Sequence, residues 1–167
     1  MKTMKKILAF ALAGVMALVL LTGCGTGSSA SHKSIAKAME DHDRGVENNL
    51  KITYTSSAAL DAKLQELAAD PIFEAVVKAV YNGQSPTIPA GVLPTNKVVY
   101  LYCGKYDKDA GKQAINLNAW GHYTHIGSNS TLAAKRQIGL ITTSCTDTNG
   151  KEVKVRFAVV VSDIPTP

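Results

Sequence analysis

The sequence lacks the local motifs that usually reveal catalysis. Its 167 residues contain no HExxH, no GxSxG, no CxxC, no phosphate-binding loop and no dinucleotide-type glycine pattern. Each of these motifs holds metal ligands, a nucleophile or a phosphate at a fixed spacing, so their absence removes the corresponding enzyme signatures. Paired carboxylates are scarce as well, because Glu40, Asp41 and Asp43 fall in one segment typical of a solvated charge run. The sequence therefore predicts no catalytic residue, no metal and no cofactor.

Two partial motifs have simpler explanations. Ser34 and Lys37 have the SxxK spacing, but the SDN and KTG motifs that accompany it are absent, and a helix N-cap explains Ser34. Asp107, Asp109 and Gly111 imitate part of a calcium loop, yet the glycine falls one position early and no glutamate stands at position 12. Lysines between these acids would repel a cation, so the segment is predicted to be a hairpin turn.

Charge is also absent from one long apolar run near the N-terminus. Residues 7–21 (ILAFALAGVMALVLL) carry no charged side chain and follow Lys2, Lys5 and Lys6. The run is shorter than the ~20 apolar residues that a transmembrane helix needs. Its length and its basic flank are typical of a secretory signal peptide.

The run ends in Leu21-Thr22-Gly23-Cys24, which resembles the lipobox of bacterial lipoproteins. The resemblance implies that residues 1–23 are removed and that Cys24 receives a diacylglycerol thioether, often with a further chain such as palmitate on its amine. Two or three acyl chains anchor a protein stably where one does not. The domain is then expected outside the cytoplasm, on the cell membrane or outer membrane. In a host with two membranes, Gly25 favours the outer one, because it is not the acidic retention residue that some lipoproteins carry after the cysteine. Cleavage elsewhere and an uncleaved anchor are the alternatives.

Removing the signal changes the charge and the cysteine count. The net charge of +5 falls to about +2, since three lysines leave with the signal, so the basic pI of 9.1 does not indicate a nucleic-acid partner. With Cys24 lipidated, Cys103 and Cys145 remain as a pair in an oxidising compartment, which predicts a disulfide worth ~4 kcal/mol. A metal or nucleophile site using one cysteine is the alternative, although no histidine is adjacent.

The mature chain reads as a tether over 24–32 and one domain over 33–167. Apolar spacing predicts a helix that begins at Ser34 and ends at Gly45, helices over 57–69 and 71–82, and a short strand over 50–55. Three prolines make 83–96 irregular. Strands are predicted over 97–103, 113–120, 135–146 and 151–162.

The last two strands are joined by Asn149-Gly150, a signal for a two-residue type I′ turn. That turn pairs Thr148 with Lys151 and Ile138 with Val161. One face of the hairpin is then apolar and the other more polar, with Cys145 on the polar face. The element order predicts an α+β fold, in which N-terminal helices pack on one face of a curved antiparallel sheet of four or five strands. The order is similar to that of cystatin-like or nuclear-transport-factor-like proteins.

The densest group of chemically versatile side chains is the segment Trp120, His122, Tyr123 and His125. Its aromatic rings and imidazoles suit a binding surface, although Trp120 would also serve simply to pack against the core. The leading prediction is a membrane-anchored envelope lipoprotein that binds a protein, peptide or glycan. The alternative is a hydrolase or metal-dependent enzyme that uses His122 and His125.

Overall fold

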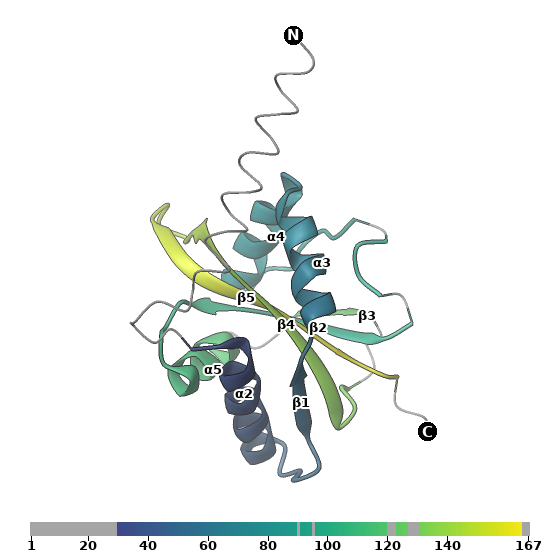
Figure 1. The fold of residues 1–167 in the computed structure, drawn as a ribbon. Coiled ribbons are helices and arrows are strands. Elements are labelled where there is room, and N and C mark those ends of the chain that lie inside the picture. The colour runs from purple at the N-terminus through teal and green to yellow at the C-terminus, as the bar shows by residue number, and fades with distance from the viewer. Residues whose placement is uncertain (1–29, 90, 95, 120–122, 127–130, 165–167) are drawn as a thin grey trace.

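The computed structural model describes residues 30–89, 91–94, 96–119, 123–126 and 131–164, with the backbone alone at 123–126 (Figure 1). The predicted lipobox and Cys24 lie outside these residues. The elements in chain order are α2 (His32–Val46), β1 (Thr53–Ser56), α3 (Ala58–Ala68), α4 (Ile72–Tyr81), β2 (Val98–Lys105), α5 (Ala110–Asn118), β3 (Tyr123–Ile126), β4 (Lys135–Thr146) and β5 (Glu152–Ser162). The predicted α+β class is confirmed.

The five strands form one sheet in the order β1-β4-β5-β2-β3. β1 runs parallel to β4, while the other three neighbouring pairs are antiparallel, so the sheet is mixed rather than purely antiparallel. β5, the last strand in the chain, lies at the centre. No helix in the described part of the chain is long and apolar enough to cross a membrane.

Helices cover both faces of the sheet, which corrects the prediction of one buried and one solvated face. On one face, α3 and α4 pack over a core that includes Phe73, Phe157 and Val159. On the other, α2 and α5 lie side by side over Met39, Leu117 and many further buried side chains (Figure 1). A sheet buried on both faces needs apolar residues at consecutive positions, and β5 meets this need from residue 157 to residue 161.

The predicted register of the final hairpin is wrong by one residue. Ile138 pairs with Val160 rather than with Val161. The cause is the turn, in which the Asp147 N–H donates to the Lys151 C=O at 2.9 Å and Gly150 has φ +76°. A three-residue loop with a left-handed glycine therefore replaces the two-residue turn. Because side chains alternate between faces, this slip moves Cys145 to the face that α3 and α4 cover.

The predicted strand over 113–120 is also wrong, because α5 occupies most of it. Asp109 begins this helix: its side chain accepts a hydrogen bond from the Lys112 N–H at 2.8 Å. Gln113, Ala114 and Leu117 lie at helical spacing and are buried. The expected hairpin turn at 106–111 is instead the connection from β2 to α5 at 106–109, followed by the first two residues of α5.

The N-terminal helix begins earlier than predicted. Ser31, not Ser34, is the N-cap of α2, and its hydroxyl accepts from the Ser34 N–H at 3.1 Å. Ala30 is already fixed, since its N–H donates to the Lys108 C=O at 2.8 Å. The predicted tether over 24–32 is thus shortened, because residues 30–32 belong to the folded domain.

Two glycines allow helices to approach the sheet closely, one on each face. A Cβ at Gly139 would lie 2.5 Å from the Leu60 Cβ of α3, and a Cβ at Gly104 would lie 2.2 Å from the Asn116 carbonyl oxygen of α5. Neither helix backbone can give way without moving as a unit, so each contact fixes the depth of its helix.

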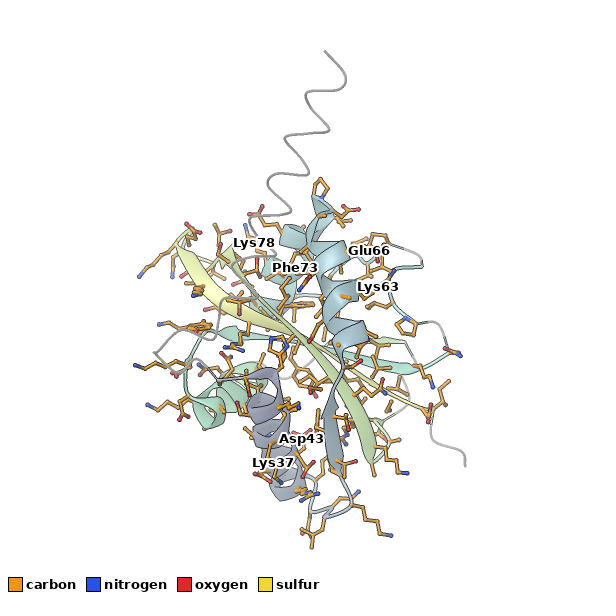
Figure 2. All side chains as sticks on the ribbon, in the orientation of Figure 1. Lys37, Asp43, Lys63, Glu66, Phe73 and Lys78 are labelled. Carbon is orange, nitrogen blue, oxygen red and sulfur yellow. The ribbon has the colours of Figure 1, made fainter. Side chains whose placement is uncertain are left out.

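An ionic network joins α2 to β1 and β4. The Asp43 carboxylate, on the side of α2 toward β1 (Figure 2), accepts from the Tyr54 hydroxyl at 2.5 Å and from Arg136 Nη1 at 2.6 Å. These three side chains are buried. Arg136 Nη2 also lies 2.8 Å from a Glu47 carboxylate oxygen. The charges are paired and hydrogen-bonded, as buried charges need to be.

A second carboxylate of α2 covers the outer edge of the sheet. Glu40 accepts from the backbone N–H of Tyr54 at 3.0 Å and pairs with Arg44 at 2.9 Å. The Arg44 Nε donates to the Ile52 C=O at 2.7 Å. The hydrogen bond from Lys37, followed by that from the Tyr54 N–H, lowers the pKa of Glu40 below its ordinary value. α2 thus satisfies backbone groups of the β1 edge that would otherwise be open to another strand.

We expect Arg136→Met to lower the free energy of unfolding by about 3–5 kcal/mol, because it leaves the buried Asp43 carboxylate without its cation. Denaturant titration measures the loss. The double variant with Asp43→Asn should recover part of it. Lys63→Met, which breaks the exposed Lys63–Glu66 pair, is the control and should cost at most ~1 kcal/mol. Equal losses in the two single variants would contradict the assignment.

We expect Gly139→Ala to destabilise the protein by about 1–3 kcal/mol, because its methyl group overlaps Leu60. Gly45→Ala in α2 is the matched control, since nothing lies within 4 Å of its added Cβ, and the better helix former should stabilise by up to ~1 kcal/mol. Thermal unfolding of both variants checks the opposite signs. A neutral Gly139→Ala would show that α3 does not rest on β4 as described.

Candidate binding site

The aromatic and histidine segment predicted from the sequence falls largely outside the described residues. This holds for Trp120 and His122. Tyr123 and His125 belong to β3, an edge strand in which Tyr123 pairs with Leu101 of β2, and only their backbone is described. The binding surface and the alternative use of both histidines therefore stay predictions. Among the described side chains, no group of three or more His, Cys, Asp or Glu residues is placed to hold a metal ion.

The predicted disulfide between Cys103 and Cys145 is not formed. Cys103 and Cys145 are free thiols, and both are buried in the core beneath α3 and α4. They occupy β2 and β4, and β5 lies between these strands, with Cys103 opposite Phe157 and Cys145 opposite Val153. Two strand spacings amount to ~9.5 Å, whereas a disulfide needs Cα atoms ~4.4–6.8 Å apart. The strand order explains why the bond is absent.

Their surroundings make both thiols poor nucleophiles. Burial, followed by the influence of Cys145, raises the pKa of Cys103 far above its usual range. Burial also raises the pKa of Cys145, to about 11. Since the thiolate is the reactive form, neither cysteine is activated for catalysis.

Asp61 connects three elements at the start of α3. One of its carboxylate oxygens accepts from the Leu140 N–H of β4 at 2.8 Å, and the other lies 2.9 Å from His32 Nδ1 of α2. The Ser57 N–H also donates to the Ile138 C=O at 2.9 Å. An Asp–His pair can orient an imidazole for proton transfer. In the described part of the chain, however, no hydroxyl or thiol is hydrogen-bonded to His32, so the contact positions α3.

A pocket opens beside this well-fixed helix. We call it the α3 groove; its volume is about 340 Å³, near the lower end for ligand sites. The lining residues come from α3, from the irregular segment before β2 and from β5: Ala59, Leu60, Lys63, Leu64, Leu67, Gly91, Val92, Leu93, Pro94 and Val159.

The α3 groove is almost entirely aliphatic. Lys63 is the one charged residue among the described residues that line it, and this lysine pairs with Glu66 on the exposed side of α3 at 2.9 Å (Figure 2). Leu64, Leu67 and Val159 are buried. Such a surface recognises an apolar group by shape and by exclusion of water.

Sequence reasoning found only one wall of this groove. The spacing of Leu60, Leu64 and Leu67 predicted a helix that buries these leucines. The opposite wall, 91–94, falls in the segment predicted to be irregular, and no local pattern indicates that Leu93 folds back onto α3. Comparison with protein-family models, curated proteins and solved structures finds no match to this chain.

We expect thiol titration of the purified protein without reductant to detect Cys103 and Cys145 in denaturant and to detect neither in the native state. Burial and raised pKa values protect both thiols until the protein unfolds. Cys103→Ala should remove one equivalent. If denaturation releases no thiol before reductant is added, the two cysteines are oxidised and the arrangement of β2, β5 and β4 is contradicted.

Proposed function

We propose that this chain is a lipid-anchored envelope protein whose domain binds a protein or peptide partner by receiving an apolar side chain in the α3 groove. The anchor is the lipid expected on Cys24, and the partner is another component of the envelope. The single observation that carries the binding role is the α3 groove, a mostly aliphatic pocket that opens at the surface of a well-packed scaffold.

The size of the α3 groove supports a side chain as its occupant. A volume of about 340 Å³ accommodates one or two large aliphatic or aromatic groups, but not a folded element. Protein interfaces commonly depend on a few such anchors seated in pockets and surrounded by weaker contacts. The exposed Lys63–Glu66 pair on the same helix offers charges of both signs for those surrounding contacts.

The chemistry of the lining favours a peptide over a glycan. Sugars are bound through many hydrogen bonds and through flat aromatic surfaces. The described lining instead consists of Leu, Val, Ala, Pro and Gly side chains together with Lys63. Burying an apolar side chain here is favourable by about 25 cal/mol per Å² of apolar surface removed from water.

The scaffold supports recognition without large rearrangement. α3 is held at its start by the Ser57 and Asp61 contacts to β4 and along its length by the close approach at Gly139. A preformed pocket spends little binding energy on ordering, which strengthens the contact for a given buried area.

The test places a photo-crosslinking phenylalanine derivative at Ala59 or at Ala62 of the full-length chain in its native envelope. Both alanines are exposed on α3, but only Ala59 lines the α3 groove. We expect a discrete adduct with one partner from position 59 and not from position 62. In a second experiment the probe replaces Lys63. Adding Ala59→Trp should then abolish the adduct because the indole ring fills the groove, whereas adding Ala62→Trp should leave the adduct unchanged. Adducts of equal yield from both positions, or unaffected by Ala59→Trp, would refute the groove as the site.

A further inference from the structure

Ala30, the first described residue of the domain, is hydrogen-bonded to two basic residues. Ala30 donates its N–H to the Lys108 C=O at 2.8 Å and accepts from Arg156 Nη2 at 3.2 Å. These bonds fix the point at which the chain leaves the domain toward its N-terminus, beside the β2–α5 connection and β5.

Cys24 precedes Ala30 by only six residues. A fully extended chain spans at most ~3.6 Å per residue, so a lipid on Cys24 lies within roughly 20 Å of Ala30. Whatever surface surrounds Ala30 therefore stays near the bilayer that holds the anchor. We call this surface the Ala30 face.

The Ala30 face carries exposed lysines from three neighbouring elements. They are Lys108 in the connection, Lys112 in the first turn of α5, and Lys154 of β5. The Lys154 ammonium lies 4.1 Å from the ring centre of Tyr106, which holds it beside the connection. Among the described residues, none of these lysines is paired with a carboxylate, unlike Lys37, Lys63 and Lys97 elsewhere.

Two aspartates on the same connection compensate only part of this charge. Asp107 and Asp109 direct a carboxylate oxygen to backbone N–H groups, those of Asp109 and Lys112, each at 2.8 Å. The Ala30 face thus keeps an excess of positive charge.

Arg156 adds a buried cation beneath this face. It is 3% exposed, its guanidinium carbon lies 5.0 Å from the ring centre of Tyr106, and its Nε has no hydrogen-bond partner in the described part of the chain. No carboxylate among the described residues pairs with it. Its charge is therefore not neutralised locally and reinforces the potential of the lysines.

An exposed apolar side chain accompanies the lysines. Ile115 is 61% exposed on α5, one turn after Lys112, while the opposite side of the helix is buried. Basic residues flanking an outward apolar side chain are the composition of surfaces that lie at the lipid headgroup boundary.

We propose that the Ala30 face lies against the anionic headgroups of the bilayer that carries the Cys24 lipid. The inference rests on the lipid anchor of the proposed function. Because two or three acyl chains already provide the affinity, the basic face sets the orientation of the domain rather than its attachment.

The test uses the full lipoprotein, extracted from membranes and reconstituted into vesicles of phosphatidylcholine alone or mixed with phosphatidylglycerol. Amide hydrogen exchange is measured over 105–116. We expect slower exchange on the anionic vesicles than on the neutral ones, and loss of this difference at high salt. A combined variant should lose the protection: Lys108→Gln, Lys112→Gln and Lys154→Gln.

The matched control removes the same charge elsewhere and should retain the protection; it combines Lys51→Gln, Lys78→Gln and Lys135→Gln, all exposed positions. Equal exchange on the two vesicle types would overturn the proposal, including the case in which Ile115 alone protects the segment equally on both. An equal loss of protection in the control variant would also overturn it. Flotation with neutral vesicles tests the anchor separately. Failure to float would refute the lipid anchor, and this proposal with it, whereas flotation without composition-dependent protection would refute only the orientation.

Discussion

The contact between Arg136 and Asp43 is the constraint on which the arrangement of this domain depends. Arg136 belongs to β4, Asp43 to α2, and the hydroxyl of Tyr54 in β1 shares the same carboxylate oxygen. One buried ion pair thereby fixes a helix and an edge strand against the sheet. Removing either charge leaves the other buried and unpaired, which costs free energy, so any arrangement that separates the two side chains is disfavoured. Glu40 acts in the same way at the edge of the sheet, where its carboxylate accepts a hydrogen bond from a backbone N–H of β1.

The fold could be predicted from the sequence where signals were local and strong. The helices predicted over 57–69 and 71–82 match α3 and α4 closely, because the cap at Ser57 and the left-handed Gly83 that bound them depend on neighbouring residues only. Elsewhere the decisive contact was distant. The hairpin at Asn149-Gly150 fits two turn types that differ by one residue in register. The choice between them decides which face holds Cys145, whereas the strand order, with β5 between β2 and β4, prevents the predicted disulfide.

The candidate site was less predictable than the fold. A helix stripe indicated Leu60, Leu64 and Leu67, but a groove needs a second wall, and 91–94 reaches α3 only through tertiary folding. α3 and the segment after α4 lie on the side of the molecule away from α5 (Figure 1). A domain resting on its Ala30 face would therefore turn the α3 groove away from the lipid, so that attachment and recognition use separate surfaces.

The central place of β5 bears on how the chain acquires its structure. β5 joins the pair β1 and β4 to the pair β2 and β3, yet it is the last element of the chain. β1 likewise cannot pair until β4 is present, since Thr53 pairs with Lys135. Neither half of the sheet can join the other until β5 is present, and such distant pairing folds slowly. The connectivity thus delays completion of the sheet until β5 pairs on both sides, and it makes loss of β5 more damaging than loss of an edge strand such as β3.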